Sequence, residues 1–137
     1  MCLSFNPLEP INFTVGNDDG NCYSFDMRKM DRAKVIHKGH VGAVSDLDFG
    51  SSGREFVTGS FDRTIRLFDF DGSRSKEVYH AKRMQIVSSV AYTVDSHYVL
   101  SGSEDMNIRM WKSVAWRPNG VVNAREQRAI EYRDKLV

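Results

Sequence analysis

Apolar and polar residues alternate through the middle of the chain, and clusters of turn-forming residues interrupt the alternation. Alternation with a period of two indicates β-strands that bury one face. The pattern predicts strands over residues 43–49, 55–60, 64–69 and 75–79. Turn residues at 50–53 and 71–73 reverse the chain. The last stretch is the most polar, as expected for the outer edge of a sheet. This segment is therefore predicted to form a four-stranded antiparallel sheet.

The same unit recurs along the chain at a pitch of 43 residues. Its landmark is a glycine followed nine residues later by an aromatic residue: Gly16 with Phe25, Gly59 with Phe68, and Gly102 with Trp111. Helical arrays of similar pitch carry a 3.6-residue apolar period, whereas these units carry alternation and turns. A repeated small sheet of about 40 to 45 residues is typical of a β-propeller blade.

The repeat predicts an all-β fold, a partial β-propeller of about three four-stranded antiparallel blades, followed by a C-terminal α-helix. The predicted blades cover residues 1–38, 39–81 and 82–112, a turn or linker covers 113–123, and the helix covers 124–137. Pro118-Asn119-Gly120 turns the chain before a convincing fourth strand of the third blade. Because propellers generally use about four to eight blades, we expect the remaining blades of its own propeller as partners.

The end of the chain changes to a helical pattern. Asn123 stands at an N-cap position with Glu126 three residues on, and Glu131 precedes Lys135 by four residues. The apolar residues of this segment form only a narrow stripe. We therefore expect the helix to pack against the propeller edge or a partner.

Charge gives limited information, because 19 Lys and Arg balance 18 Asp and Glu. A local positive excess lies near the last blade boundary, at Arg74, Lys76, Lys82 and Arg83. Such a cluster is usually a solvated surface, and the alternative is a contact with RNA or phosphate. On that alternative, Arg125 and Arg128 of the predicted helix would contribute as well.

Other chemistry is sparse. Cys2 and Cys22 show no paired spacing, and the four histidines do not cluster, so we expect no metal site and no cofactor. No apolar run approaches the roughly 18 residues of a membrane span, and no signal peptide is evident. We therefore expect a cytosolic or nuclear protein without a membrane partner.

The middle unit opens with Gly39-His40 and closes with Phe68-Asp69. This arrangement resembles the WD repeat, in which a glycine-histidine pair opens the unit and tryptophan-aspartate closes it. The resemblance implies a hydrogen-bonded ladder that fixes the blade, formed by His40, Thr58 or Ser60, Asp62 and Phe68. Phenylalanine has no N–H group, so this ladder is expected to lack its last donor.

A catalytic role for His40 and Asp62 is the alternative to this structural one. The third unit holds Lys82 and Arg83 at the positions of the glycine-histidine pair. One blade can lose a structural ladder, whereas an enzyme cannot lose its catalytic pair. We therefore predict that the protein is not an enzyme and has no catalytic residues.

Several longer segments narrow the resemblance. They include Tyr23-Ser24-Phe25-Asp26-Met27-Arg28, Ser73-Arg74-Ser75-Lys76-Glu77-Val78-Tyr79-His80 and Lys82-Arg83-Met84-Gln85. With the terminal helix, they resemble the Sof-type WD-repeat proteins. That resemblance implies a nuclear and nucleolar scaffold of the small-subunit processome, supporting ribosomal RNA processing. Its implied partners are processome proteins, a small nucleolar ribonucleoprotein and precursor ribosomal RNA.

A second function remains open. Phe25-Asp26-Met27-Arg28 is similar to the tryptophan-aspartate-any-arginine box by which some WD proteins dock the adaptor of a cullin-based ubiquitin ligase. On this hypothesis Asp26 and Arg28 make the contact, and the protein is a substrate receptor. Short matches of this kind also arise by chance in WD arrays.

Overall fold

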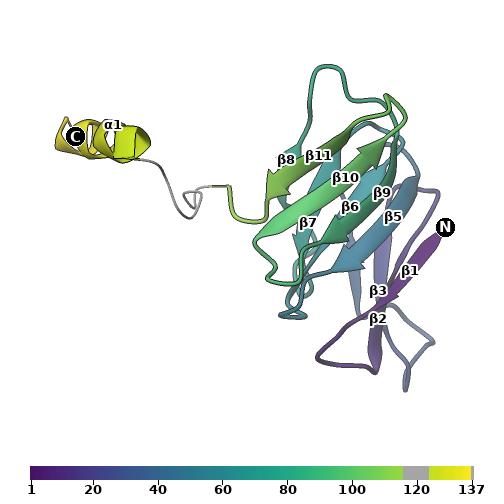
Figure 1. Ribbon diagram of the computed structural model, residues 1–137. Coiled ribbons are helices and arrows are strands. Elements are labelled where there is room, and N and C mark those ends of the chain that lie inside the picture. The colour runs from purple at the N-terminus through teal and green to yellow at the C-terminus, as the bar shows by residue number, and fades with distance from the viewer. Residues whose placement is uncertain (116–123, 137) are drawn as a thin grey trace.

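The computed structural model describes residues 1–115 and 124–136. Eleven strands and one helix lie in this part of the chain (Figure 1). The strands are β1 (Cys2–Phe5), β2 (Asn12–Gly16), β3 (Cys22–Asp26), β4 (Val35–His37), β5 (Val44–Phe49), β6 (Glu55–Ser60), β7 (Ile65–Asp69), β8 (Ser75–Tyr79), β9 (Val87–Tyr92), β10 (Tyr98–Ser103) and β11 (Ile108–Lys112). The helix is α1 (Ala124–Lys135).

The strands form three antiparallel sheets in chain order. The first sheet runs β1-β2-β3-β4, the second β5-β6-β7-β8, and the third β9-β10-β11. The third sheet has only three strands among the described residues, as the sequence predicts. The all-β fold of repeated small sheets is thereby confirmed, as an open array of blades and not a closed ring.

The strands of the second sheet agree closely with the alternation pattern. The predicted strand over residues 64–69 begins one residue later, at Ile65. The reason is local, because the Thr64 hydroxyl donates to Asp62 Oδ1 at 2.6 Å and its backbone N–H donates to the same oxygen at 3.0 Å. Thr64 therefore belongs to the turn that Asp62 organises.

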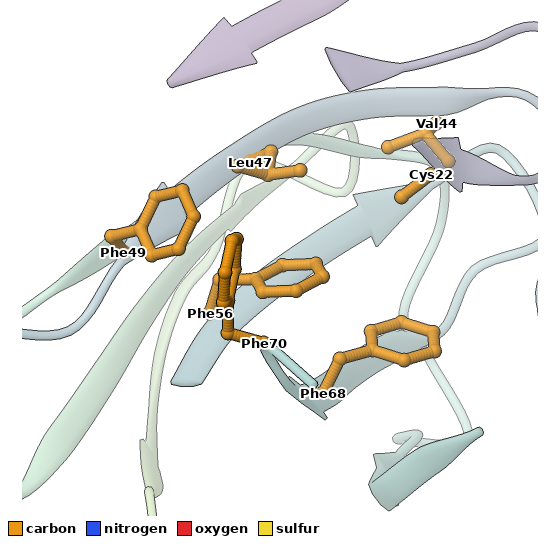
Figure 2. Packing of buried hydrophobic residues seen from close by; sticks show 7 residues of the cluster. All are labelled: Cys22, Val44, Leu47, Phe49, Phe56, Phe68 and Phe70. Carbon is orange, nitrogen blue, oxygen red and sulfur yellow. The ribbon is translucent and has the colours of Figure 1, made fainter. Parts of the chain in front are cut away.

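The core lies in two layers between the sheets. The contact between the first and second sheets, here the first seam, is filled by an aromatic-rich cluster (Figure 2): Cys22, Val44, Leu47, Phe49, Phe56, Phe68 and Phe70. Phe56 and Phe68 stack with ring centroids 5.4 Å apart. The second seam, between the second and third sheets, contains Val57, Ile65, Leu67, Met84, Val87, Val90 and Val99. The second sheet therefore buries both of its faces.

The repeated glycine lies where a valine of the next sheet approaches the backbone closely. Gly16, Gly59 and Gly102 all lie on the second strand of their sheets, paired on both sides. A Cβ atom on Gly16 would lie 2.6 Å from Val44 Cγ1, and one on Gly59 would lie 2.6 Å from Val87 Cγ1. The first valine of each following sheet thus sits against the bare backbone of the preceding one. This close approach explains why the glycine recurs.

Polar contacts join the inner strands β5 and β9 across the second seam. Asp46 Oδ2 accepts the backbone N–H of Val90 at 2.9 Å, and Asp48 Oδ2 accepts that of Tyr92 at 2.7 Å. Burial raises the pKa of Asp48, although the backbone N–H groups of Tyr92 and Phe49 partly oppose the effect. These two aspartates therefore supply acceptors for an inner strand that has no strand neighbour on that side.

Helix α1 is separated from the sheets in Figure 1. Of its described side chains, only Ile130 is partly buried, and the others are exposed. Packing of this helix against the sheets, which the narrow apolar stripe predicts as one option, is therefore not seen in the described residues. Asn123 and most of the predicted linker lie outside those residues.

Candidate functional site

The ladder residues of the second sheet come together beside the first seam. His40 Nδ1 lies 3.0 Å from Asp62 Oδ2, and His40 Nε2 lies 2.6 Å from Thr58 Oγ1. A carboxylate can only accept, so Nδ1 carries a proton and donates it to Asp62. The imidazole is fully buried. Its two hydrogen bonds join the loop before β5 to β6 and to the turn between β6 and β7.

Thr58, and not Ser60, is the strand hydroxyl that contacts His40. Ser60 Oγ instead donates to the carbonyls of Gly42 and Ala43, at 3.0 and 2.8 Å. Phe68 lies with its ring centroid 6.4 Å from that of His40 and offers no donor. Thr58 donates to the Arg66 carbonyl at 3.3 Å in this blade.

The third sheet has the complementary half of this ladder. Trp111 Nε1 donates to Ser101 Oγ at 2.9 Å, while the positions equivalent to Gly39 and His40 hold exposed Lys82 and Arg83. Asp105, one repeat after Asp62, pairs with Arg109 instead of a histidine. The second and third sheets thus keep different parts of the ladder.

The electrostatics of Asp62 follow from its partners. Burial opposes ionisation of this carboxyl, but the hydrogen bonds from His40, Thr64 and the Val41 N–H outweigh burial. They hold the pKa of Asp62 well below its ordinary value of 3.8. Asp62 therefore acts as a partly buried anchor for donors from three residues, a role that needs no bound substrate.

A second buried polar chain crosses the first sheet and was missed by the sequence analysis. Thr14 Oγ1 and Ser24 Oγ lie 2.8 Å apart, and Ser24 Oγ lies 2.8 Å from His37 Nε2. His37 Nδ1 donates to the carbonyl of Gly72 in the second sheet. Nδ1 carries a proton, and burial lowers the pKa of His37, so the imidazole is neutral near pH 7 and Nε2 accepts from Ser24. His80 repeats His37 at the same pitch but is exposed, so the spacing alone gives no signal.

We predict that this buried chain of hydrogen bonds makes the protein less stable in mild acid. Burial lowers the pKa of His37 below 6.5, only partly opposed by its bond to Gly72. The unfolded chain therefore binds a proton more readily than the native one, and stability falls as the pH drops below 6.5. Urea unfolding of the intact protein at pH 7.5 and 5.5 measures this loss, which should be smaller in His37→Asn. An equal loss in both proteins would contradict the assignment.

The candidate phosphate contacts do not form one patch in the described residues. Lys76 is paired with Glu55 and Asp69, at 3.4 and 3.2 Å. Arg74 precedes β8, whereas Lys82 and Arg83 follow it, and a five-residue strand is about 16 Å long. Lys82 and Arg83 are exposed and adjacent, so they form the strongest positive pair of the set. Arg125 and Arg128 are exposed on α1.

Asp26 and Arg28 are paired with each other at the end of β3. Arg28 Nε donates to Asp26 Oδ1 at 3.2 Å and Nη2 donates to Oδ2 at 2.9 Å. These hydrogen bonds lower the pKa of Asp26 to about 2. Phe25 stacks on Phe13, with centroids 5.6 Å apart, so it anchors the box in the sheet. The Arg28 side chain is 70% exposed and can reach a partner.

Within residues 1–115 and 124–136, no group of three or more His, Cys, Asp or Glu side chains could hold a metal ion. The described residues also contain no helix with the length and apolar character that a bilayer crossing demands.

Comparison with known families decides the class of protein. Residues 33–69 and 74–112 match the family described as "WD domain, G-beta repeat". The chain belongs to the WD-repeat family. Each matched segment of this WD-repeat protein begins near an outer strand, β4 or β8, and continues through the next sheet. One sequence unit therefore contains the outer strand of one blade and the first three strands of the next.

Individual relatives confirm the resemblance to Sof-type WD-repeat proteins. The chain is 46% identical to Protein SOF1 of Saccharomyces cerevisiae over 134 residues, which cover 98% of this chain and 27% of that protein. It is 47% identical to DDB1- and CUL4-associated factor 13 of Danio rerio over 135 residues, covering 98% of this chain and 30% of the relative. The Homo sapiens protein of the same name is 50% identical over 107 residues, which cover 78% of this chain and 24% of that relative. The chain thus spans less than a third of the length of these relatives.

Proposed function

We propose that the intact protein is a non-enzymatic scaffold of the nucleolar small-subunit processome, supporting ribosomal RNA processing and ribosome biogenesis. The observation that carries this proposal is the 46% identity to Protein SOF1 along 98% of the chain. The fold suits such a role, because rigid sheets present fixed loops to several partners at once. Its partners on this proposal are processome proteins, a small nucleolar ribonucleoprotein and precursor ribosomal RNA.

Lys82 and Arg83 are the residues of this scaffold best suited to contact RNA phosphate. Both side chains are exposed in the loop between β8 and β9. Met84, next to them, is buried at 1% exposure in the second seam and fixes the loop to the sheets. A cationic pair on an anchored loop loses little entropy when it binds a phosphate. Arg74, Arg125 and Arg128 are secondary candidates.

We predict that the double variant Lys82→Glu/Arg83→Glu binds precursor ribosomal RNA at least about tenfold more weakly at moderate salt. Each neutralised phosphate contact releases counterions, so the variant should also show a shallower dependence of affinity on salt concentration. The measurement is filter binding of the full-length protein at several salt concentrations. Lys76→Ala is the control, because Lys76 is already paired with two carboxylates. Wild-type affinity and salt dependence in the double variant would remove the phosphate role.

A second candidate function is a substrate receptor of a cullin-RING ubiquitin ligase. The relatives named DDB1- and CUL4-associated factor 13 favour it, as does the exposed Arg28 held in place by Asp26. A pre-positioned guanidinium suits an adaptor surface, because its orientation is fixed before binding.

We expect Arg28→Ala to weaken capture of DDB1 by the full-length protein if this second function holds. The loss should reach about tenfold or more, since a buried interfacial arginine commonly contributes over about 1.4 kcal/mol. Arg63→Ala is the control, because Arg63 lies in an exposed turn elsewhere. Quantitative pull-down with purified DDB1 gives the answer, and equal capture by all three proteins would rule out a contact through this box.

A further inference from the structure

The loop between β3 and β4, residues 27–34, concentrates positive charge and exposed methionine on one short segment. Its cations are Arg28, Lys29, Arg32 and Lys34, opposed within the loop only by Asp31. Met27 is 52% exposed and Met30 is 61% exposed. The candidate functions use only Arg28 from this set, so most of the loop's chemistry is unassigned.

A hollow in the surface lies beside this loop. It is lined by Asp26, Lys29, Asp31, Arg32, Ala33 and Lys34. The Asp26 carboxylate already accepts three hydrogen bonds from Arg28, so it contributes little free negative charge. The three cations Lys29, Arg32 and Lys34 therefore outnumber Asp31, the other carboxylate of the lining, and make the hollow positive.

The loop is fixed to the sheets before any partner arrives. The Met27 N–H donates to the Ile11 carbonyl at 2.8 Å, and the Lys29 N–H donates to the Asp26 carbonyl at 3.0 Å. At the other end, the Lys34 N–H donates to the Ser24 carbonyl at 2.6 Å. The Lys34 ammonium lies 5.2 Å from the ring centroid of Phe70, a cation–π contact. Binding to such a loop costs little conformational entropy.

We propose that the β3–β4 loop and its hollow form a docking surface for an acidic segment of a partner protein that also carries apolar side chains. Acidic residues complement Lys29 and Arg32, and apolar residues cover Met27 and Met30. Flexible methionines suit a protein surface, because they adapt to irregular apolar shapes. RNA is the poorer fit, since the loop has no aromatic ring on which a base could stack and RNA brings no apolar side chains to cover Met27 and Met30.

This docking surface does not rest on either proposed function. The guanidinium of Arg28 is already paired with Asp26, so the segment is recognised chiefly by Lys29, Arg32 and the methionines. It also lies apart from the Lys82 and Arg83 pair. The turn equivalent to this loop in the second sheet joins β7 to β8, and those two residues follow the opposite end of β8.

Site-specific crosslinking tests the proposal in the full-length protein. The photoreactive amino acid p-benzoylphenylalanine replaces Met30, and crosslinked segments are sequenced by mass spectrometry after irradiation in cells. We expect segments with an excess of Asp and Glu interspersed with Leu, Ile or Phe. Adding Lys29→Glu and Arg32→Glu should lower the crosslinking yield about tenfold, because two attractive contacts become repulsive.

Two controls separate this surface from the proposed functions. Lys82→Glu/Arg83→Glu should leave the Met30 crosslinking yield unchanged. Arg28→Ala should lower the yield by less than the charge reversal does, because it frees only the Asp26 carboxylate beside the hollow. The milder pair Lys29→Gln/Arg32→Gln should lower the yield by a smaller factor, while a wild-type melting temperature shows that the fold is intact. Crosslinks to RNA, segments without acidic excess, the absence of crosslinks, or a yield unaffected by charge reversal would each overturn the proposal.

Discussion

Replacing Gly59 with valine is expected to destabilise the intact protein by about 3 kcal/mol or more. Even the first added atom, Cβ, would lie 2.6 Å from Val87 Cγ1 and 3.0 Å from Val90 Cγ1. Valine favours strands, but the whole scale of strand propensity spans only about 1 kcal/mol. The steric clash therefore outweighs the gain, and urea unfolding should report a lower free energy of unfolding.

Gly72→Ala is the matched control for this substitution. A Cβ atom on Gly72 would have its nearest neighbour at 3.4 Å, which is ordinary van der Waals contact. We expect that change to stay within about 0.5 kcal/mol of wild type. If Gly59→Val unfolded at the same urea concentration as wild type, Val87 could not lie as close to the backbone of Gly59 as the structure shows.

Replacing Asp62 with alanine is expected to cost about 3 kcal/mol, because it leaves the buried His40 ring and the partly buried Thr64 without their acceptor. The carboxylate accepts from the His40 ring, the Val41 N–H and both the hydroxyl and the N–H of Thr64. Since its native pKa is depressed, Asp62 stabilises the fold above pH 3.8, and this contribution is lost as the pH falls further. The deficit of the variant, measured by urea unfolding, should shrink in that acid range.

Asp105→Ala is the comparison, because Asp105 stands one repeat after Asp62 and has no histidine partner. Asp105 is about as exposed as Asp62, at 12% against 10%, but its partners are Arg109 and the exposed Asn107. Its removal leaves no buried imidazole without a partner and should cost about 1 kcal/mol or less. Equal losses in the two alanine variants would show that His40 adds nothing to the anchoring role of the aspartate.

The strands of the second sheet could be predicted from the sequence because alternation and turn residues fix them locally. Residues 55–60 and 75–79 coincide with β6 and β8. The pitch of 43 residues also predicted that the sheets repeat along the chain. The structure adds how they meet, with the first valine of one sheet against the glycine of the sheet before it, and with Asp46 and Asp48 bonded to β9.

Contacts that depend on three-dimensional register could not be predicted. Thr14, Ser24 and His37 come from three strands, and nothing in their spacing indicates that they meet in one chain of hydrogen bonds. The choice between Thr58 and Ser60 depended on which hydroxyl faces the His40 ring. Lys76 looked like part of a basic cluster, but the fold places it between Glu55 and Asp69, which come from other strands.

The seams share a shape but not their polar bonds, and this difference encodes the order of the blades. Val44 and Val87 fill equivalent spaces over Gly16 and Gly59, so either valine could occupy either space. Between the described sheets, the bond from His37 to Gly72 lies in the first seam and the bond from Asp46 to Val90 lies in the second. A blade exchanged by recombination would therefore fit sterically but leave these polar groups without partners. Apolar packing thus permits duplication of a blade, whereas the hydrogen bonds specific to each seam keep the blades in their order.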